Sequence, residues 1–484
     1  MSITLVIHLH WLCFPDFLLY SSFVPSVAVR HVAALTMHFI NLPLMPPVRG
    51  LCHHLVAFRP TVLCSSARRQ HSSTSSAAAN ALPLEGVRVL DLTRVLAGPY
   101  CTMILGDYGA EIIKVENPKS GDDTRAWGPP FAPNKDSNDN QPGESAYFLG
   151  VNRNKKSITV NFKKPEGLDI LKRLAAKSDV MVENFVPGKL DEIGLGYEDL
   201  RKVNPRLIYA SITGYGPDGP YAKAPGYDVI TEAEAGLMYI TGEPDGPPVK
   251  VGVAITDMTT GLYTHGAVLA ALLARARTGL GQKLDISLLE CQVASLANIA
   301  HSYLIGGQEA KRWGTQHAAI VPYQAFPTKD SFIVVGAGND GQFRKLCTKI
   351  ERLDLVENEK FKTNAARVEN RKELIDLLSD IFRQHPTSHW LREFKSLGFP
   401  FAPVNNIQQT FEHPQVIHRE MIQEVDHPRA GRIKLTGIPV KYSHTKPSIR
   451  LPPPILGQHT FEVLSNMLEY TEEEIDGFVE RGII

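Results

Sequence analysis

The feature that most constrains the fold is a pair of buried strands joined by a turn and a short helix. Val87–Leu92 (VRVLDL) and Ala110–Val115 (AEIIKV) have the apolar composition of buried strands, and Cys101–Tyr108 between them is predicted to be a helix. Two strands connected through a helix run parallel in one sheet, as in nucleotide-binding folds. We therefore predict an α/β fold with a large Rossmann-like domain, whose ligand binds beyond the carboxyl ends of the strands.

Strands and helices continue to alternate after this unit. Ser157–Phe162, Val180–Glu183 and Leu207–Ile212 are predicted strands, and Glu166–Lys177 is a predicted amphipathic helix. The turn after the first strand of the chain lacks the GxGxxG pattern, which disfavours a nicotinamide or flavin dinucleotide. The loop Asp122–Ser145 is rich in Gly, Pro, Asn and Asp, which indicates either disorder or a flap over the site.

The length of 484 residues allows two or three domains. A second α/β region contains the predicted strands Phe332–Gly336 and Pro400–Val404, and the tail includes a predicted helix at Thr460–Leu468. The predicted domains are a leader at 1–80, a large domain at 82–289 that is completed by 425–484, a linker at 290–321 and a small α/β domain at 322–424.

The first 80 residues differ in composition from the rest of the chain. They hold five arginines, no lysine and one acid, Asp16, and they are rich in serine and histidine. This composition is typical of a mitochondrial transit peptide, so we predict a mitochondrial matrix protein. Histidines, prolines and Asp16 interrupt the apolar stretch Ile3–Val27, which disfavours a membrane anchor. The segment from Met45 has the better transit-peptide composition, and we hypothesise that translation starts there in some products.

Charge and cysteine usage argue against several classes of function. Basic and acidic residues both number 51, which does not favour nucleic-acid binding. Beyond the leader, Cys101, Cys291 and Cys347 are widely spaced and form no CxxC pair, which argues against a disulfide framework or a zinc site. The GxSxG, HExxH and P-loop patterns are absent from the sequence. No bound metal is predicted.

One acid, Asp257, lies where the spacing of apolar residues changes from that of a strand to that of a helix. Val251, Val253 and Ile255 alternate as in a strand, and a long, mostly buried helix is predicted after Asp257. Near a helix N-terminus a carboxylate is electrostatically favoured. Two interpretations follow: an N-cap aspartate, which the local sequence favours, or a carboxylate nucleophile. The apolar residues of the predicted helix are Leu262, Ala267, Leu269, Ala270, Leu272 and Leu273.

Several longer blocks occur in a fixed order along the chain. They include PLEGVRVLDLTRVLAGPYCTMILGDYGAEIIKVENPKSGDDTR, NRNKKSITVN, DVMVENFVPGKL, ITGYGPDGPY, PGYD, GVAITDMTTGLY and ILGQHT. In amino-acid sequence and in order, these blocks resemble the family III CoA-transferases, the group that includes formyl-CoA and carnitine CoA-transferases. The resemblance runs from about Leu82 to the C-terminus. Within the family, TRAWGPPF, AKRWGTQHAAIVPYQAF and IVVGAGND are most similar to members that use succinyl-CoA with glutarate or hydroxymethylglutarate.

The catalytic aspartate of that family falls on Asp257, so the resemblance implies the nucleophile interpretation. The implied enzyme moves CoA from succinyl-CoA to glutarate or a related dicarboxylate through an aspartyl-CoA thioester, with CoA thioesters as substrates and no permanently bound cofactor. The resemblance also implies a homodimer of interlocked chains. Two alternatives stay open: an acyl-CoA racemase of the same fold, and a non-catalytic CoA- or nucleotide-binding protein.

The resemblance further implies a CoA site at the strand ends. Lys163 could pair with a phosphate, or it could be a solvated surface lysine. Leu96 stands where some members have a glutamine, and Asn117 where some have an arginine, so the contacts of those two residues do not carry over. The implied CoA-binding residues are Arg94, Val95, Leu96, Ala97, Val160, Lys163, Asn184 and Phe185.

A dicarboxylate has a second carboxylate, for which arginine is a suitable partner. Arg125, Arg153 and Arg312 are the candidates, and a structural ion pair is the alternative for each. Trp127 and Trp313 could wall the acyl pocket or pack in the core.

Two further features bear on the chemistry. The turn Gly336-Ala337-Gly338 could offer backbone N–H groups to an oxyanion, or it could be an ordinary strand-ending turn. Tyr227 stands where the similar α-methylacyl-CoA racemases carry a histidine base. Because tyrosine is a poor base at neutral pH, racemase chemistry is disfavoured.

Overall fold

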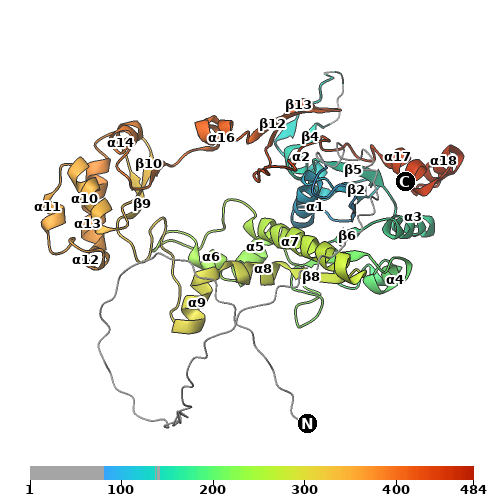
Figure 1. Ribbon diagram of the computed structural model, residues 1–484, viewed down its shortest axis with the longest axis horizontal. Helices are drawn as coiled ribbons and strands as arrows, with labels where there is room; N and C mark the ends of the chain where they lie inside the picture. Colours follow the sequence, from blue (N-terminus) through green and yellow to red (C-terminus); the bar gives the residue numbers. More distant parts are fainter. Residues whose placement is uncertain (1–80, 137, 139–141) are drawn as a thin grey trace, which may run out of the picture. The chain divides into compact units, whose positions relative to one another are not determined.

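The computed structural model describes residues 81–136, 138 and 142–484 (Figure 1). The predicted transit peptide at residues 1–80, with its suggested start at Met45, lies outside the described residues. Residues 137 and 139–141 of the predicted flap also lie outside them.

A six-stranded sheet organises the large α/β region. Its strands are all parallel and lie in the order β5-β2-β1-β6-β7-β8. Counted in chain order this is 3-2-1-4-5-6, the order of dinucleotide-binding folds, so the prediction of a Rossmann-like sheet is confirmed. In this order, ligands bind where the winding reverses, at the carboxyl ends of β1 and β6. The strands are β1 (Arg88–Asp91), β2 (Glu111–Glu116), β5 (Lys155–Thr159), β6 (Val180–Glu183), β7 (Ile208–Thr213) and β8 (Lys283–Ser287).

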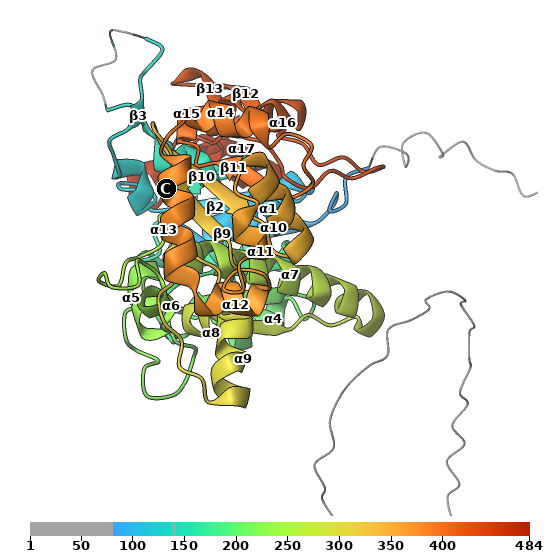
Figure 2. The ribbon, with the colours of Figure 1, turned by 90° about the vertical axis from the view of Figure 1, so that its left-hand side faces the viewer.

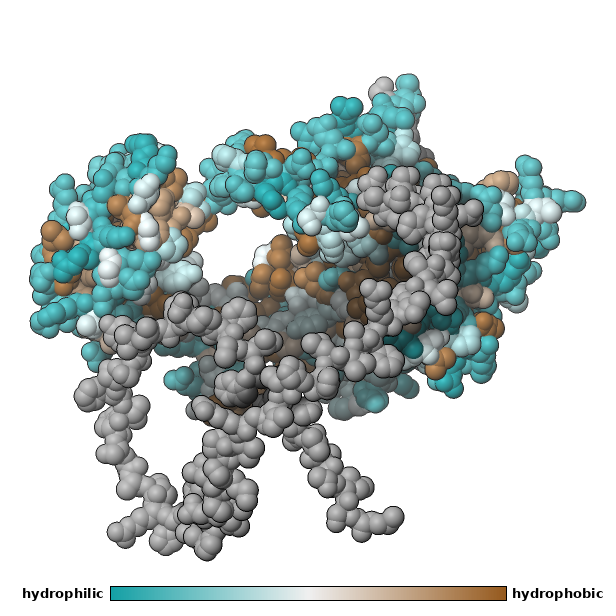
Figure 3. Space-filling view, viewed as in Figure 1, coloured by the Kyte–Doolittle hydropathy of each residue, from teal (hydrophilic) through white to brown (hydrophobic). Residues whose placement is uncertain are grey.

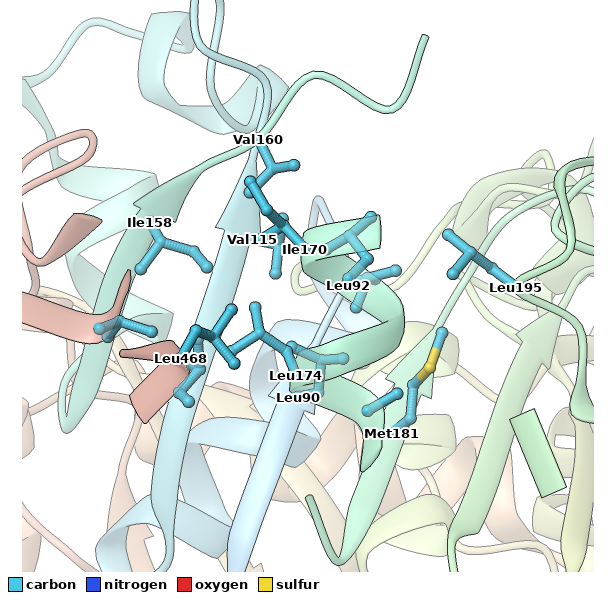
Figure 4. Packing of buried hydrophobic residues seen from close by; sticks show 14 of the residues in the cluster. Leu90, Leu92, Val115, Ile158, Val160, Ile170, Leu174, Met181, Leu195 and Leu468 are labelled. Carbon is cyan, nitrogen blue, oxygen red and sulfur yellow. The ribbon is translucent and has the colours of Figure 1, made fainter. Parts of the chain in front are cut away.

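Helices cover both faces of this sheet. Side chains of a strand point alternately to its two faces, so Leu90 packs with Ile170 of α3 (Figure 4), whereas Val89 belongs to the core that α1 and α7 cover. The main covering helices are α1 (Ala97–Asp107), α3 (Pro165–Ala176), α4 (Tyr197–Val203) and α7 (Ile255–Thr278).

The C-terminal tail packs against the β5 edge of the sheet. The N–H of His459 donates to the carbonyl of Ser157 at 2.9 Å, and the N–H of Asn161 donates to the carbonyl of Ile483 at 2.7 Å. Leu468 of the tail joins the core that contains α3 (Figure 4). The predicted helix at residues 460–468 is confirmed as α17 (Thr460–Leu468), and α18 (Glu472–Glu480) follows it.

A second, antiparallel sheet has the order β11-β10-β9. Its core is aromatic and includes Phe326, Phe343 and Phe382, all fully buried, with α10 and α13 beside the strands (Figure 2). The elements are β9 (Tyr323–Pro327), β10 (Phe332–Gly336), β11 (Phe401–Pro403), α10 (Asp340–Lys349), α11 (Asp354–Glu357), α12 (Asn364–Glu369), α13 (Arg371–Phe382) and α14 (Thr387–Glu393).

Shorter elements connect these bodies. No helix in the described part of the chain is both long and apolar enough to span a membrane. The connecting helices are α2 (Ala146–Val151), α5 (Asp228–Glu234), α6 (Leu237–Ile240), α8 (Leu288–Ser295), α9 (Ala297–Gly306), α15 (Ile407–Glu412) and α16 (Pro414–His418). The remaining pieces are the hairpins β3 (Phe131–Ala132) with β4 (Glu144–Ser145) and β12 (Ile422–His427) with β13 (Gly431–Thr436), and 3-10 turns at Asp123–Ala126 and Asp191–Ile193.

Two local predictions are wrong. Val251 and Val253 form no strand, because α7 already begins at Ile255 and the segment before it is irregular. Helix α1 begins at Ala97, four residues earlier than predicted. Pro99 lies in its first turn, where the missing N–H of proline breaks no helical hydrogen bond.

Helix α7 is long, as predicted, but it is not mostly buried. Leu262 is 46% exposed and Leu273 is 70% exposed. Apolar side chains stand at the surface in the area around α7 (Figure 3, compare Figure 1). Leu262 and Leu273, which were predicted to be buried, therefore lie on the surface of this chain. The buried face consists of Thr256, Thr260, Gly261, Thr264, Val268, Ala271 and Arg275.

Candidate active site

The first turn of α7 carries Asp257, and another residue caps that turn. The N-cap residue is Ala254, which supplies no side-chain cap. One carboxylate oxygen of Asp228 accepts the backbone N–H groups of Thr256 at 2.8 Å and Asp257 at 3.1 Å. The interpretation of Asp257 as an N-cap is therefore wrong, because Asp228 takes that role from α5.

The side-chain carboxyl of Asp257 is left without a protein partner. No donor or cation among the described residues contacts it within hydrogen-bond or ion-pair distance. Burial and, secondly, the negative charge of Asp228 raise the pKa of Asp257 from 3.8 to about 7. A partly buried carboxyl with an elevated pKa and no internal partner is typical of a reacting group rather than a structural one.

Helices α1 and α7 cross closely beside this carboxyl. A Cβ added to Gly261 would lie 2.7 Å from the carbonyl oxygen of Ala97, so only glycine fits the crossing. Asp257 and Gly261 are four residues apart and share one face of α7, which directs Asp257 toward the N-terminal end of α1. The backbone N–H groups of Leu96 and Ala97 have no acceptor in the described part of the chain. Donors for a developing negative charge therefore lie on the side that Asp257 faces.

A cavity of about 720 Å³ contains Asp257 and is called here the Asp257 cavity. It lies at the carboxyl ends of β1, β6 and β7, where the strand order predicts a ligand. Its lining includes Arg94, Val95, Leu96, Ala97, Asn184, Phe185, Trp127, Tyr227 and Asp257, all of which the sequence had singled out.

A second cavity of about 370 Å³, the Lys163 cavity, lies at the ends of β1, β2, β5 and β6. Val160 and Lys163 line it, so each predicted CoA-binding residue lines one or both cavities. Lys189 was not predicted, although it follows the end of β6 within the VENFVPGKL block. The residues shared by the two cavities are Arg94, Asp123, Phe185 and Lys189.

The turn between β1 and α1 is held in a strained shape by buried polar groups. Val95 has a φ of 71°, a left-handed conformation that is costly for a β-branched residue. Its N–H donates to Asp122 at 3.2 Å, and the amide side chain of Asn184 both accepts from the N–H and donates to the carbonyl of Arg94. Asp122 is in turn paired with the buried ammonium group of Lys114 at 2.9 Å.

A second buried ion pair lies beneath the same turn, between Asp91 and Lys155 at 3.1 Å. Burial alone would raise the pKa of Asp91, but Lys155, Lys114 and two threonine hydroxyls lower it to about 2. Burial lowers the pKa of Lys155 to about 8, although Asp91 opposes that change. These pairs make the turn a rigid wall of the Asp257 cavity.

Comparison with known proteins identifies the family. A sequence model described as CoA-transferase family III matches residues 84–460. This chain belongs to family III of the CoA-transferases. Among curated relatives of this CoA-transferase, the human protein named succinyl-CoA:glutarate CoA-transferase is 53% identical over 84% of this chain and 90% of its own length. A protein of Agrobacterium fabrum named succinate–glutarate CoA-transferase is 43% identical over 80% of this chain and 96% of its own.

Solved structures of related proteins agree with the fold. A CaiB/BaiF family protein from Brucella suis has a TM-score of 0.73 and 41% identity, covering 80% of this chain and 99% of its own. A protein from Mycobacterium tuberculosis has a TM-score of 0.69 and 32% identity, covering 79% of this chain and 99% of its own.

The structure separates the three candidate arginines of this CoA-transferase. Arg125 forms a two-point ion pair with Glu116, with both N–O distances at 2.7 Å. Arg153 pairs in the same way with Asp107 at 2.9 and 2.7 Å and is buried. Arg125 and Arg153 therefore form structural ion pairs, the alternative that the sequence left open for each of them.

Arg312 has no carboxylate partner among the described residues. One of its terminal nitrogens donates to the carbonyl of Tyr239 at 2.8 Å, and its guanidinium carbon lies 5.6 Å from the centre of the Tyr239 ring. Its Nε is buried without an acceptor in the described chain. The Arg312 side chain lines neither of the two cavities, and no carboxylate of the described chain neutralises its charge.

Trp127 lines the Asp257 cavity, and Tyr147 packs against this tryptophan. Trp127 is 43% exposed and packs edge-on against Tyr147 with ring centres 5.2 Å apart. Burial and the charges of Asp257 and Asp228 raise the pKa of Tyr147 to about 12, so its hydroxyl keeps its proton at neutral pH. The sequence reasoning missed Tyr147. Its only signal was an aromatic residue directly after the Gly- and Pro-rich loop.

The remaining candidates lie elsewhere. The N–H groups of the glycine-rich turn donate within the protein: Gly336 to Pro400 O, Ala337 to Pro322 O and Gly338 to the side chain of Gln342. The turn lines neither cavity, and its role toward an oxyanion stays a prediction. Trp313 lies under Lys311 and Arg371 as a cation–π partner and also lines neither cavity.

No metal centre is found in the described part of the chain, where no three His, Cys, Asp or Glu side chains are grouped to hold an ion. Cys101, Cys291 and Cys347 are buried free thiols. Burial raises the pKa of Cys347 to about 12, so this thiol is not a nucleophile at neutral pH.

Proposed function

We propose that this CoA-transferase moves CoA from succinyl-CoA to glutarate or a related dicarboxylate, such as hydroxymethylglutarate, through a thioester on Asp257. The human and Agrobacterium relatives carry names with the same donor and acceptor. The observation that carries the mechanism is the carboxyl of Asp257, which has no partner among the described residues. It lies in a cavity at the sheet edge, directed toward N–H groups that have no acceptor among those residues.

The reaction proceeds by acyl transfer to and from this carboxylate. Ionised Asp257 attacks the thioester carbonyl of succinyl-CoA, forming a mixed anhydride as the C–S bond breaks and CoA thiolate leaves. The thiolate then attacks the aspartyl carbonyl, which yields an aspartyl-CoA thioester and free succinate. Glutarate attacks that thioester, and the same two steps run in reverse to give glutaryl-CoA and ionised Asp257.

Each addition places a negative charge on a carbonyl oxygen. The N–H groups of Leu96 and Ala97 at the start of α1, which have no acceptor in the described chain, are suited to stabilise it, because fixed dipoles need no reorganisation. Losing one such donor costs about 3 kcal/mol of transition-state stabilisation in comparable sites.

The two adjoining cavities suit the two ends of CoA. In this proposal the adenosine and phosphate part occupies the Lys163 cavity, and the pantetheine arm enters the Asp257 cavity past Phe185. Arg94, Lys163 and Lys189 supply positive charge for the phosphates. Arg94 is only partly neutralised, by a solvent-exposed pair with Asp123 at 2.9 Å.

A second copy of the chain is proposed as the partner. Leu273 of α7 is 70% exposed, and Leu304 and Ile305 of α9 are 75% and 82% exposed. Large apolar side chains at this degree of exposure are typical of a surface that another protein covers. A homodimer should appear in sedimentation experiments, and Ile305→Asp should shift it toward monomer. A wild-type monomer at micromolar concentration would contradict this part of the proposal.

The leader composition supports import into mitochondria. N-terminal sequencing of the mature protein from isolated mitochondria tests this. A mature protein that starts at Met1 would contradict both the cleaved leader and the internal start at Met45.

Mass spectrometry tests the central proposal directly. Incubation with succinyl-CoA followed by hydroxylamine or borohydride should modify Asp257, and Asp257→Ala should lose the adduct and the exchange activity but still bind CoA. An adduct on another residue, or full turnover by the alanine variant, would contradict the mechanism.

An acceptor panel then measures specificity. Glutarate, hydroxymethylglutarate, adipate, malonate, oxalate and carnitine are compared with succinyl-CoA as donor. The racemase alternative predicts exchange of the α-hydrogen of a 2-methylacyl-CoA with deuterated water. We expect none, because a tyrosine, here the exposed Tyr227, is a poor base at neutral pH.

A further inference from the structure

Helix α5 contacts the start of α7 through two carboxyl groups. Asp228 accepts the N–H groups of Thr256 and Asp257, as described above. One turn further along α5, Glu232 accepts the N–H of Val251 at 3.1 Å, just ahead of α7. Residues four apart on a helix share a face, so the two acids lie side by side against the segment that carries the nucleophile.

The second oxygen of Glu232 has no visible donor. Glu232 is fully buried, and its Oε1 lacks a hydrogen-bond partner in the described part of the chain. Buried carboxylates normally have donors or cations at both oxygens, because an unpaired buried charge is strongly unfavourable. The carboxyl of Asp228 is the group that interacts with it, and two ionised carboxylates at neighbouring positions would repel each other.

We propose that Glu232 carries a proton at neutral pH and donates it to Asp228, and that this pair positions the first turn of α7 beneath Asp257. The chain of contacts then runs from the Glu232 hydroxyl to the ionised Asp228 carboxylate, and from there to the N–H groups of Thr256 and Asp257. Glu232 touches no reacting atom, so it is a positioning residue. Its catalytic consequence rests on the proposed role of Asp257, whereas its protonation does not.

The surroundings of the pair agree with a held proton. Burial is the largest effect and raises the pKa of Glu232. The hydrogen bond from the Val251 N–H opposes it, the charge and hydrogen bond of Asp228 raise the pKa further, and Lys250 lowers it least. Helix α6, with the sequence LMYI, adds no carboxyl group and no cation, and its one titratable side chain is Tyr239. The other groups that face the pair or pack near it are Asp257 on α7, Tyr147 on α2 and Glu290 on α8, whose carboxylate is taken by the hydroxyl of Ser287.

A shared proton also limits the charge near the nucleophile. The pair then carries one negative charge rather than two. Asp257 is opposed by Asp228 alone, which leaves it able to ionise near neutral pH. Glutamine is the matched substitute, because its carbonyl can accept from Val251 and its amide can donate to Asp228 as a protonated glutamate does.

Infrared difference spectroscopy between the wild type and Glu232→Gln tests the proton without any turnover. We expect the wild type to show a carboxylic-acid carbonyl band at pH 7 that is missing in the variant and moves in deuterated water. A difference spectrum with only carboxylate bands would overturn the proposal.

Single-turnover formation of the Asp257 thioester tests the positioning role. Glu232→Ala should slow it at least tenfold, and Glu232→Gln should restore it to within about threefold with the same pH midpoint. A lower midpoint in the glutamine variant would show that a negative charge was removed and would overturn the proposal. Should the alanine variant fail to fold, the glutamine variant and the infrared result decide. Absence of any thioester in the wild type would refute the proposed function, and the infrared result would still stand.

Discussion

Gly261 of α7 faces the carbonyl oxygen of Ala97 in α1 so closely that a Cβ would lie 2.7 Å from it. This contact sets the distance between the nucleophile's helix and the helix end that offers free N–H groups. It is therefore a sensitive test of the geometry on which the proposed chemistry depends.

We expect Gly261→Ala to lower the free energy of unfolding by about 2 kcal/mol, as overpacking does, and to slow thioester formation because α1 and α7 are pushed apart. Urea titration and single-turnover kinetics measure the two effects. Gly150→Ala in helix α2 is the matched control, because Gly150 is a helical glycine outside the surface proposed for the second copy. A Cβ there meets nothing within 4 Å, so this variant should gain about 0.5 kcal/mol. Equal effects of the two substitutions would refute the close crossing.

The pH dependence of turnover should reflect Asp257. Only the ionised carboxylate attacks the thioester, and its pKa is raised to about 7. We therefore expect kcat/KM for succinyl-CoA to rise about tenfold per pH unit below the midpoint and to level off above it. Steady-state kinetics measure this dependence between about pH 5.5 and about pH 8.5, a range of roughly three pH units that spans the expected midpoint. A profile that is flat from pH 5.5 upward would contradict the raised pKa.

Asp257→Asn should make the folded protein more stable at alkaline pH. The pKa of Asp257 is about 7 in the folded state, and its ordinary value of 3.8 applies to the unfolded state. Between these two pH values the folded state therefore binds more protons than the unfolded state. The stability of the wild type relative to the variant therefore falls as pH rises from about 4 to about 7. We expect the variant to gain about 4 kcal/mol at pH 8 and little near pH 4, measured by urea unfolding. A wild type that is the more stable protein at pH 8 would contradict the unpaired carboxyl.

Arg312 has no acidic partner in the described chain, and although it lines neither of the two cavities, we predict that it binds the distal carboxylate of the acceptor. Arg312→Met should raise the KM for glutarate at least about tenfold, the effect of losing one charge-assisted hydrogen bond, and should leave a monocarboxylate acceptor nearly unaffected. Initial rates with the two acceptors measure the difference.

Arg153→Met serves as the contrasting variant for that prediction. It leaves the buried Asp107 unpaired, so it should reduce the free energy of unfolding by about 3–5 kcal/mol without changing acceptor preference. If Arg153→Met alters the preference and Arg312→Met does not, the assignment of the arginines is reversed.

Local sequence patterns predicted much of the fold. The strand Val180–Glu183 and the helix Thr460–Leu468 have the bounds that were predicted, because a buried strand and an amphipathic helix each carry their own period. The start of α7 was misplaced, because its cap comes from Asp228, 29 residues earlier in the chain. The partner of Arg153 could not be predicted for the same reason, because Asp107 is 46 residues away in the chain.

By itself, the sequence determined the parallel α/β class, the family and the identity of Asp257 as the acid to examine. These depend on the local spacing of hydrophobic residues and on residue patterns within contiguous blocks. Only the tertiary structure decided that Asp228 caps α7, that Arg125 and Arg153 are already paired, and that Glu232 is buried against Asp228. Those facts depend on which groups distant segments bring within about 3 Å of each other, and such distances are set by packing.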